Sequence, residues 1–201
     1  MNSPLLLRVG GVQDNSLIYG PGNRFVIWVQ GCTLACKGCW NQQFWPSGGG
    51  TEISVDDMIG RIMDSPGIEG ITLLGGEPLQ QAEAVLQLIT KVRDNDLSVF
   101  LYSGYEESEL DETQLSCVAS SDIVVLGRYV EQLRDTSLRW RGSSNQRIRF
   151  PTDRYSGLVV EEFREIEVEL APDGRLSVFG YPDDEFMRMV GLQSEGDQQQ
   201  T

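Results

Sequence analysis

The sequence predicts an α/β protein built on a parallel sheet, with a small β-hairpin near the C-terminus. Four apolar segments alternate with segments that carry a helical apolar face, a pattern typical of parallel strands joined by right-handed crossovers. The apolar segments end in loops that contain glycine. Acidic and apolar residues then alternate at 165–170, before the turn residues 171–174 and a second apolar run at 176–179. That alternation predicts a hairpin with one side exposed to solvent.

Each predicted element has a local reason. Strands are expected where apolar residues run together, at 5–12, 25–30, 71–74, 99–102, 123–126 and 148–150. A turn is expected at 14–15 and a short returning strand at 17–19. Helices are expected after Ser54, which with Asp57 marks a helix N-terminus, and at 79–93, 106–119 and 184–190. The three glycines at 48–50 predict a flexible connection, and the polar residues 193–201 predict a disordered tail.

The composition fits one globular core with a small addition. A chain of 201 residues, 40% of them hydrophobic, is long enough for one domain. We divide it into a core of residues 1–150 and an acidic C-terminal extension of residues 151–201, which holds the hairpin, the short helix and the polar tail. The extension contains 12 acidic and 4 basic residues. Its charge either keeps the surface soluble or offers a docking face to a basic partner.

Charge and hydropathy argue against several classes of partner. Lys and Arg number 16 against 30 Asp and Glu, so the net charge is −14, and we expect no nucleic acid as a partner. No apolar run approaches the length of a membrane span, and the N-terminus lacks the features of a signal peptide. We therefore expect a cytoplasmic protein with no membrane partner.

Three of the four cysteines, Cys32, Cys36 and Cys39, lie within eight residues with the spacing C-x3-C-x2-C. Clustered cysteines in a cytoplasmic chain favour a metal site over disulfides. Three thiolates leave a soft-metal centre with one open position, which favours an iron–sulfur cluster over zinc. A closed zinc site needs a fourth ligand, and because the chain has no histidine, only Cys117 or a carboxylate is available. Cys117 lies in a predicted helix, where we expect a core residue.

The cysteine motif resembles the signature of the radical S-adenosylmethionine (SAM) enzymes. Residues 75–78, with the sequence Gly-Gly-Glu-Pro, follow the next predicted strand and are similar to the second motif of that family. Alone, this string is equally typical of a strand-to-helix turn with a helix-starting proline. Its position after the cysteine loop favours the family. The resemblance implies a partial (β/α) barrel of the radical SAM type, a [4Fe-4S] cluster, and S-adenosyl-L-methionine bound at the fourth iron.

The resemblance also implies which residues bind the two cofactors. Cys32, Cys36 and Cys39 are the implied cluster ligands, and no catalytic side chain is implied beyond the cluster and cofactor. Loops at strand ends converge on one edge of such a sheet. They supply the implied SAM contacts, Gly75, Gly76, Glu77, Pro78, Ser103, Arg128 and Asn145. Arg128 can equally be an ordinary surface arginine, and Asn145 can equally cap a strand.

Further strings narrow the resemblance to the activases of glycyl-radical enzymes, and among them to the activating proteins of anaerobic ribonucleotide reductase. The strings span roughly residues 5–150 and include 20–22, 30–32, 76–81, 102–105, 127–129 and 142–146. The resemblance implies reductive cleavage of SAM to a 5′-deoxyadenosyl radical that takes a hydrogen atom from a glycine. The implied partners are a glycyl-radical enzyme, with anaerobic ribonucleotide reductase as the candidate, and a one-electron donor such as flavodoxin or ferredoxin.

Two positions depart from the subgroup. Tyr19 stands where Asp or Asn precedes Gly-Pro-Gly, and Leu126 stands where Asp precedes the Gly-Lys/Arg pair. These departures bear on the protein substrate rather than on the cluster. Two alternatives remain: a stand-alone radical SAM enzyme that modifies a peptide or small metabolite, and a non-catalytic iron–sulfur electron carrier. A carrier has no use for the Gly-Gly-Glu-Pro motif or the other strand-end loops.

Overall fold

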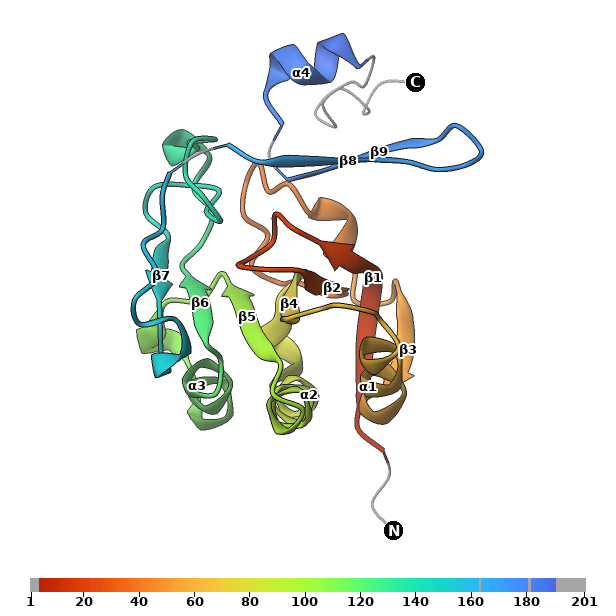
Figure 1. Cartoon of the computed structure of the whole chain (residues 1–201). Coiled ribbons are helices and arrows are strands. Elements are labelled where there is room, and N and C mark those ends of the chain that lie inside the picture. The colour runs from red at the N-terminus through yellow and green to blue at the C-terminus, as the bar shows by residue number, and fades with distance from the viewer. Residues whose placement is uncertain (1–3, 163, 181, 191–201) are drawn as a thin grey trace.

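The computed structural model describes residues 4–162, 164–180 and 182–190 (Figure 1). Within them, a seven-stranded sheet has the order β3-β1-β2-β4-β5-β6-β7. Four of its strands run parallel: β2 (Arg24–Val29), β4 (Gly70–Gly75), β5 (Ser98–Ser103) and β6 (Ile123–Leu126). The predicted α/β class and its parallel centre are confirmed.

The sheet is mixed rather than parallel throughout, because its outer strands pair antiparallel. They are β1 (Leu6–Ser16), β3 (Thr51–Ser54) and β7 (Arg147–Arg149). A short connection at 17–23 joins β1 to β2, and a connection of that length allows only an antiparallel pair. The predicted turn at 14–15 and strand at 17–19 are wrong, since β1 continues to Ser16, which pairs with Arg24. Strand β3, which follows the glycine run, was not predicted.

Three helices cross between strands; the first begins after Ser54 as predicted, and the other two are shorter than predicted. They are α1 (Val55–Met63), α2 (Ala82–Asp94) and α3 (Glu112–Ala119). The Ser54 hydroxyl accepts a hydrogen bond from Asp57 N at 3.0 Å, as the predicted N-terminus requires. The predicted helix at 106–119 is interrupted because Asp111 caps α3 by accepting from Gln114 N. Single 3₁₀ turns occupy Gln42–Phe44, Pro78–Gln81, Glu107–Glu109, Glu131–Leu133 and Asp153–Tyr155.

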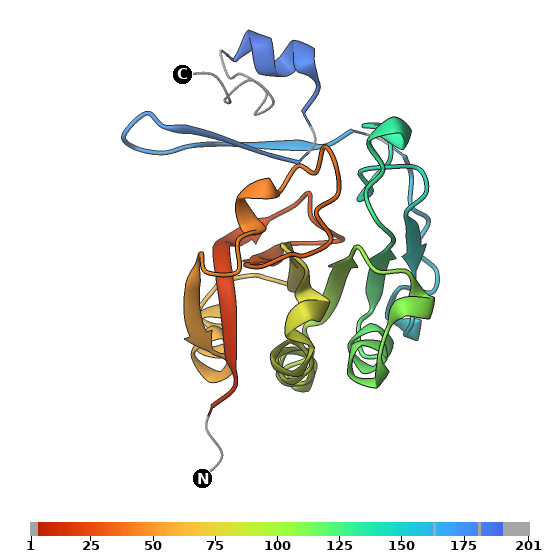
Figure 2. The same ribbon diagram turned by 180° about the vertical axis from the view of Figure 1, so that it is seen from behind.

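The two faces of the sheet bury different side chains. One face packs aliphatic residues such as Ile27, Leu73 and Leu101 against the three helices, which lie on the same side of the strands (Figure 2). The other face carries aromatic residues, including Trp28, Phe100 and Tyr102. Phe100 and Tyr102 stack with their ring centroids 4.7 Å apart. This aromatic face is where the pocket described below opens.

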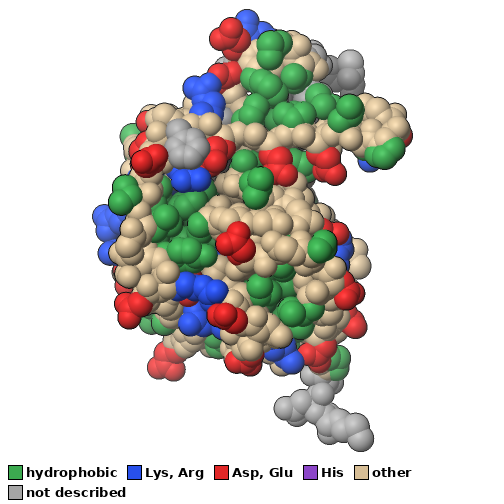
Figure 3. Space-filling model, viewed as in Figure 1, with side chains coloured by type: hydrophobic (Ala, Val, Ile, Leu, Met, Phe, Trp, Pro, Cys, Tyr) green, Lys and Arg blue, Asp and Glu red, His purple; other side chains and the backbone are tan. Residues whose placement is uncertain are grey.

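The predicted hairpin is confirmed as β8 (Ile166–Leu170) paired with β9 (Leu176–Gly180), and the final helix as α4 (Asp184–Met189). The hairpin crosses the top of the sheet from the β7 side towards β1 (Figure 1). Hydrophobic side chains are exposed over the hairpin and α4 (Figure 3), among them Val168, Leu170 and Met189. The predicted disorder at 193–201 lies outside the described residues. None of the described helices has the length and apolar character that crossing a membrane requires.

Candidate functional site

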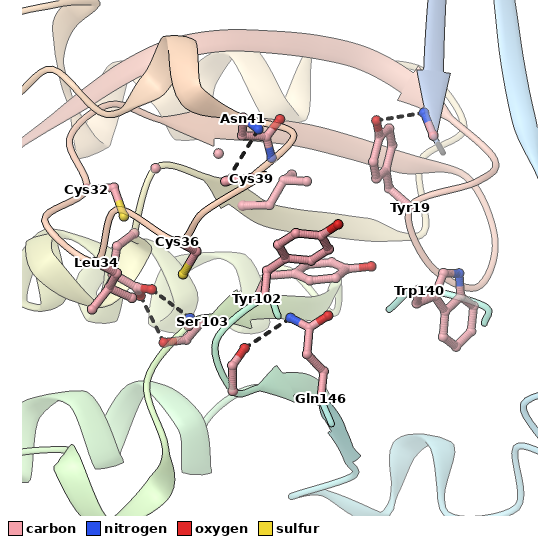
Figure 4. Close-up of a pocket in the computed structure, with 18 of the residues that line it drawn as sticks. Tyr19, Cys32, Leu34, Cys36, Cys39, Asn41, Tyr102, Ser103, Trp140 and Gln146 are labelled. Carbon is pink, nitrogen blue, oxygen red and sulfur yellow. Dashed lines mark hydrogen bonds between the residues drawn. The ribbon is translucent and has the colours of Figure 1, made fainter. Parts of the chain in front are cut away.

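A pocket opens at the carboxyl ends of the parallel strands, with about 1080 Å³ of free space when its open side is included. The strand ends bring together residues that are far apart in the sequence (Figure 4). The predicted site residues that line the pocket are Cys32, Cys36, Cys39, Gly75, Gly76, Glu77 and Ser103. Loops after β2, β4 and β5 therefore meet at one site, as expected for ligand sites in such sheets.

The cysteine loop leaves β2 and is closed by backbone hydrogen bonds. Gly31 N donates to Phe44 O at 2.7 Å, and Cys32 N donates to Trp45 O at 3.0 Å. Within the loop, Ala35 and Gly38 have positive φ angles of 46° and 71°, and Cys39 N donates to Cys36 O at 3.1 Å. These left-handed residues coil the chain tightly enough for three cysteines to line the same pocket.

The three thiols form a donor set suited to an iron–sulfur cluster. Burial raises the pKa of each one, and a neighbouring thiol adds to that effect. Backbone N–H groups lower the pKa in turn, those of Leu34 and Ala35 acting on Cys32 and that of Asn41 on Cys39. A cationic centre would favour the thiolates, and the amides would then stabilise their charge.

No three Cys, Asp or Glu side chains of the described chain converge where one metal ion could bind. A cluster differs from a single ion, because each thiolate binds a different iron and the sulfurs stay farther apart. Cys117 is fully buried in α3, packs in the aliphatic core and donates its S–H to Ala82 O at 3.4 Å. Burial raises the pKa of its thiol to about 12. The expectation that Cys117 is a core residue is confirmed.

The glycine pair at the end of β4 allows two strand ends to touch. Gly75 has a φ of +106°, and a Cβ there would lie 2.7 Å from Trp28 Cα. A Cβ on Gly76 would lie 2.3 Å from Gly31 O. Gly76 N donates to Val29 O at 2.8 Å, and Glu77 N donates to Gly31 O at 2.9 Å. Only glycine permits this approach, which sets Glu77 beside the cysteine loop.

The carboxylate of Glu77 is buried, with 1% of the residue exposed. It accepts hydrogen bonds from Leu79 N at 3.0 Å, from the Ser103 hydroxyl at 2.9 Å and from Gly104 N at 2.8 Å. Burial raises the pKa of Glu77 to about 7, although these three donors oppose the rise. Pro78 is buried directly after it and begins the 3₁₀ turn Pro78–Gln81.

Two glutamines of this turn tie it to its neighbours, a role that sequence reasoning did not assign. The Gln80 amide donates to the Thr33 hydroxyl at 2.7 Å and to the Tyr105 hydroxyl at 3.1 Å. The Gln81 amide donates to Gln30 O at 3.1 Å. Both residues stand in the string 76–81 that carried the resemblance, which was the available signal.

Comparison with known proteins agrees with this geometry. A family model described as a 4Fe-4S single cluster domain matches residues 18–149. The chain is 36% identical to the anaerobic ribonucleoside-triphosphate reductase-activating protein of Vibrio cholerae over 138 residues. This aligned stretch covers 65% of this chain and 89% of that protein. The protein of the same name from Escherichia coli K12 is 35% identical over 138 residues, 65% of this chain and 90% of that protein. The protein of the same name from Enterobacteria phage T4 is 34% identical over 143 residues, which are 68% of this chain and 89% of that protein.

The chain belongs to the family of anaerobic ribonucleoside-triphosphate reductase-activating proteins. It is therefore a radical SAM activating enzyme, and its cofactors are a [4Fe-4S] cluster and S-adenosylmethionine. The predictions of family, enzyme class and cofactors are confirmed. The alternative of a non-catalytic electron carrier is not supported.

Arg128 and Asn145 do not line the pocket of this activating enzyme. Arg128 forms a two-pronged ion pair with Glu109, and its Nη2 lies 2.8 Å from Glu109 Oε1. The Asn145 amide donates to Arg128 O at 2.8 Å, while its own carbonyl oxygen is buried without a hydrogen-bond partner among the described residues. Contacts from either side chain to SAM stay predictions.

The neighbouring Gln146 does line the pocket. Its amide donates to Gly127 O at 3.0 Å, and its carbonyl oxygen accepts from Gly142 N at 2.8 Å. The string 142–146 therefore shapes the pocket through Gln146. Leu126, one of the two departures from the subgroup, is buried at the end of β6.

Tyr19, the other departure, lines the pocket. Its phenol oxygen accepts a hydrogen bond from Gly180 N at 3.2 Å. Burial raises the pKa of that phenol to about 12. Tyr19 therefore links the pocket to the C-terminal hairpin.

Proposed function

We propose that this activating enzyme installs a glycyl radical on an anaerobic ribonucleoside-triphosphate reductase. One observation carries the proposal: the three-thiol loop and the buried carboxylate of Glu77 line one pocket at adjoining strand ends. The curated relatives, named for activation of that reductase, support the same partner. In this proposal the open sheet corresponds to the partial (β/α) barrel of the radical SAM type, and the core of residues 1–150 carries the chemistry.

The proposed cluster ligands are Cys32, Cys36 and Cys39. Bound together, the cluster and SAM supply a 5′-deoxyadenosyl radical, with the electron coming from a donor such as flavodoxin or ferredoxin. The protein provides the binding site and shields it. A cytoplasmic location remains a prediction from the sequence.

Glu77 is the residue that we assign to the cationic part of SAM. Its carboxylate is buried and forms no ion pair within the described residues, and its three partners are neutral donors. A buried carboxylate without a cation is costly. A ligand that carries a positive charge would remove that cost. Gly75 and Gly76 permit the close approach, and Ser103 and Pro78 hold the carboxylate in position.

The remaining walls of the pocket are largely apolar. Leu34, Leu74, Tyr102 and Leu138 line it together with Trp140. Such walls exclude water and strengthen the electrostatic interactions made inside.

The ligand assignment is tested by two matched cysteine variants. After anaerobic reconstitution with iron and sulfide, we expect Cys36→Ala to lose the brown cluster absorbance and Cys117→Ala to keep it. Cys36 lines the pocket, whereas Cys117 is a small core residue. The reverse result would overturn the assignment.

The reaction is tested with dithionite, SAM and the reductase. We expect 5′-deoxyadenosine and a glycyl signal in the electron paramagnetic resonance spectrum of the reductase. Deoxyadenosine without that signal would favour a stand-alone radical SAM enzyme, and no deoxyadenosine would refute both.

A further inference from the structure

We propose that the β8–β9 hairpin forms the entrance wall of the pocket and positions the polypeptide substrate there, with Glu167 as the anchor of the wall. The inference rests on the proposed function, because it takes the substrate to be a polypeptide that presents a glycine. The family match ends at residue 149, before the hairpin begins. We therefore infer the role of the hairpin from its contacts with the core.

The pocket has two ends (Figure 4). Cys32 and Cys36 lie at one end, Tyr19 and Trp140 lie at the other, and Tyr102 lies between them. The hairpin region contributes Glu165, directly before β8, and Gly180, the last residue of β9, to the lining. Because Gly180 N donates a hydrogen bond to the phenol oxygen of Tyr19, Gly180 lies at the end of the pocket away from the thiols. The hairpin therefore forms part of the wall at that end, which we take as the entrance for the substrate.

Glu167 fastens the hairpin to the end of β1 and to the first residue after it. Its carboxylate accepts hydrogen bonds from the Ser16 hydroxyl at 2.6 Å, from the Gln13 amide at 3.0 Å and from Leu17 N at 3.4 Å. The ring of Phe179 lies beside that of Trp28, with centroids 6.1 Å apart. These contacts hold one side of the hairpin against the core.

Arg139 fastens the opposite side. Its Nε lies 3.1 Å from Glu165 Oε2, and its guanidinium lies over the ring of Trp140 at 4.6 Å from the centroid. Its backbone N–H donates to Glu162 at 2.7 Å. The chain that leads into β8 is thus tied to the loop before β7. With both anchors made, the hairpin bridges the pocket entrance from the β1 side to the β7 side.

The hairpin is docked through the face that carries Glu167 and Phe179, which stand opposite each other in the β8–β9 pair. Val168 and Leu170 are 46% and 69% exposed, whereas Glu167, between Ile166 and Val168, points towards the core. A strand that serves only to cover a core buries its apolar side. Here the hydrogen bonds of Glu167 act together with the packing of Phe179 on Trp28, and removing the Glu167 carboxylate leaves that packing in place. Glu167 is accordingly a positioning residue.

Glu169 provides a matched control. It lies two residues further along β8, on the same face and with the same charge, and it is exposed without an ion pair or hydrogen bond from its side chain to the described residues. Glu167→Ala removes the anchor, and Glu169→Ala removes only a charge. Glu167→Gln keeps one acceptor for Ser16 and should recover part of the function.

The test uses the full-length, reconstituted enzyme with the anaerobic ribonucleoside-triphosphate reductase of the same organism. Glycyl-radical formation is followed as a function of reductase concentration. We expect Glu167→Ala to raise the apparent KM for the reductase roughly five- to tenfold with a smaller change in kcat. Glu167→Gln should lie between Glu167→Ala and wild type, and Glu169→Ala should match wild type. The dissociation constant of the reductase with the cluster-free chain should follow the same order.

Each other outcome overturns the inference in a recognisable way. Equal KM and dissociation constants for Glu167→Ala and Glu169→Ala would show that the hairpin does not position the substrate. A lower melting temperature of Glu167→Ala with an unchanged KM would reduce its role to stability, and a weaker affinity for SAM alone would make the hairpin a cofactor wall. Wild-type enzyme that forms deoxyadenosine but no glycyl signal would instead refute the proposed function, before any variant is compared.

Discussion

Two charged side chains are buried in the same sheet, Arg24 at the amino ends of the parallel strands and Glu77 at their carboxyl ends. Both are at most 1% exposed. Arg24 is surrounded by acceptors that belong to the two neighbouring strands β4 and β5, whereas Glu77 faces the pocket. The comparison separates a charge that completes the fold from a charge that awaits a ligand.

Arg24 is fully satisfied by neutral oxygens. Its guanidinium donates to the Thr72 hydroxyl at 3.3 Å, to Ser98 O at 3.2 Å, and to the Ser98 hydroxyl and Ile71 O. Burial lowers its pKa to about 10, so it stays protonated at neutral pH. It forms no ion pair within the described part of the chain. A guanidinium with five donors can join β2, β4 and β5 in this way without a carboxylate.

Glu77 is less completely satisfied. Its three donors are neutral, and burial still raises its pKa to about 7. Part of the Glu77 population is thus protonated at neutral pH when no ligand is bound. Burial of a charged side chain therefore does not by itself mark a ligand site. A ligand site is indicated instead by a buried charge that has no opposite charge from the protein beside it and that lies at the strand ends where ligands bind.

The largest expected effect is on the structural side of this comparison. Arg24→Met removes the guanidinium and leaves the buried oxygens of Thr72, Ile71 and Ser98 without their donor. We expect a loss of about 3 to 5 kcal/mol in the free energy of unfolding. Urea denaturation of the cluster-free protein measures it. Arg61→Met, at an exposed ion pair with Asp14, should change stability by no more than about 0.5 kcal/mol. Similar losses for both variants would show that the buried network contributes little.

The next effect is the pH dependence that Glu77 imposes. Its pKa is higher in the folded cluster-free protein, about 7, than the ordinary value of 4.5. The folded state therefore binds more protons, and stability falls as pH rises between these values. Relative to Glu77→Gln, the wild type should lose up to about 3 kcal/mol across that window. Urea titrations from about pH 5 to 8 give the difference. A pH-independent difference would mean that Glu77 titrates normally.

The smallest effect concerns one donor to Glu77. Ser103→Ala removes the hydrogen bond of 2.9 Å from the serine hydroxyl. We expect the pKa of Glu77 to rise further, because the donor favours the ionised form. The free energy of unfolding should fall by about 1 kcal/mol at pH 8 and by less at pH 5. An equal loss at both pH values would assign Ser103 a packing role only.

Local patterns in the sequence determined much of the protein. The spacing of the three cysteines, the glycine pair before Glu77 and the apolar strands are contiguous features. The first two carried the family resemblance that implied the cofactors, and the strands predicted the parallel centre of the sheet. The acidic alternation at 165–170 predicted the hairpin for the same reason, because a period of two is visible within one strand. Ser54 and Asp57 likewise predicted the start of α1, because the hydrogen bond between them joins residues only three positions apart.

Tertiary structure alone decided where these pieces meet. The burial of Arg24 depends on Ser98, 74 residues away, and the docking of the hairpin depends on Glu167 and Gln13, which are 154 residues apart. The antiparallel outer strands of the sheet and the hydrogen bonds of Gln80 and Gln81 likewise depend on contacts between residues that are far apart in the sequence. Contacts between distant residues leave no period in the sequence, because each needs only one suitable side chain at either end. For that reason the sequence indicated which cofactors this enzyme binds, and the fold decided what stands at the pocket entrance.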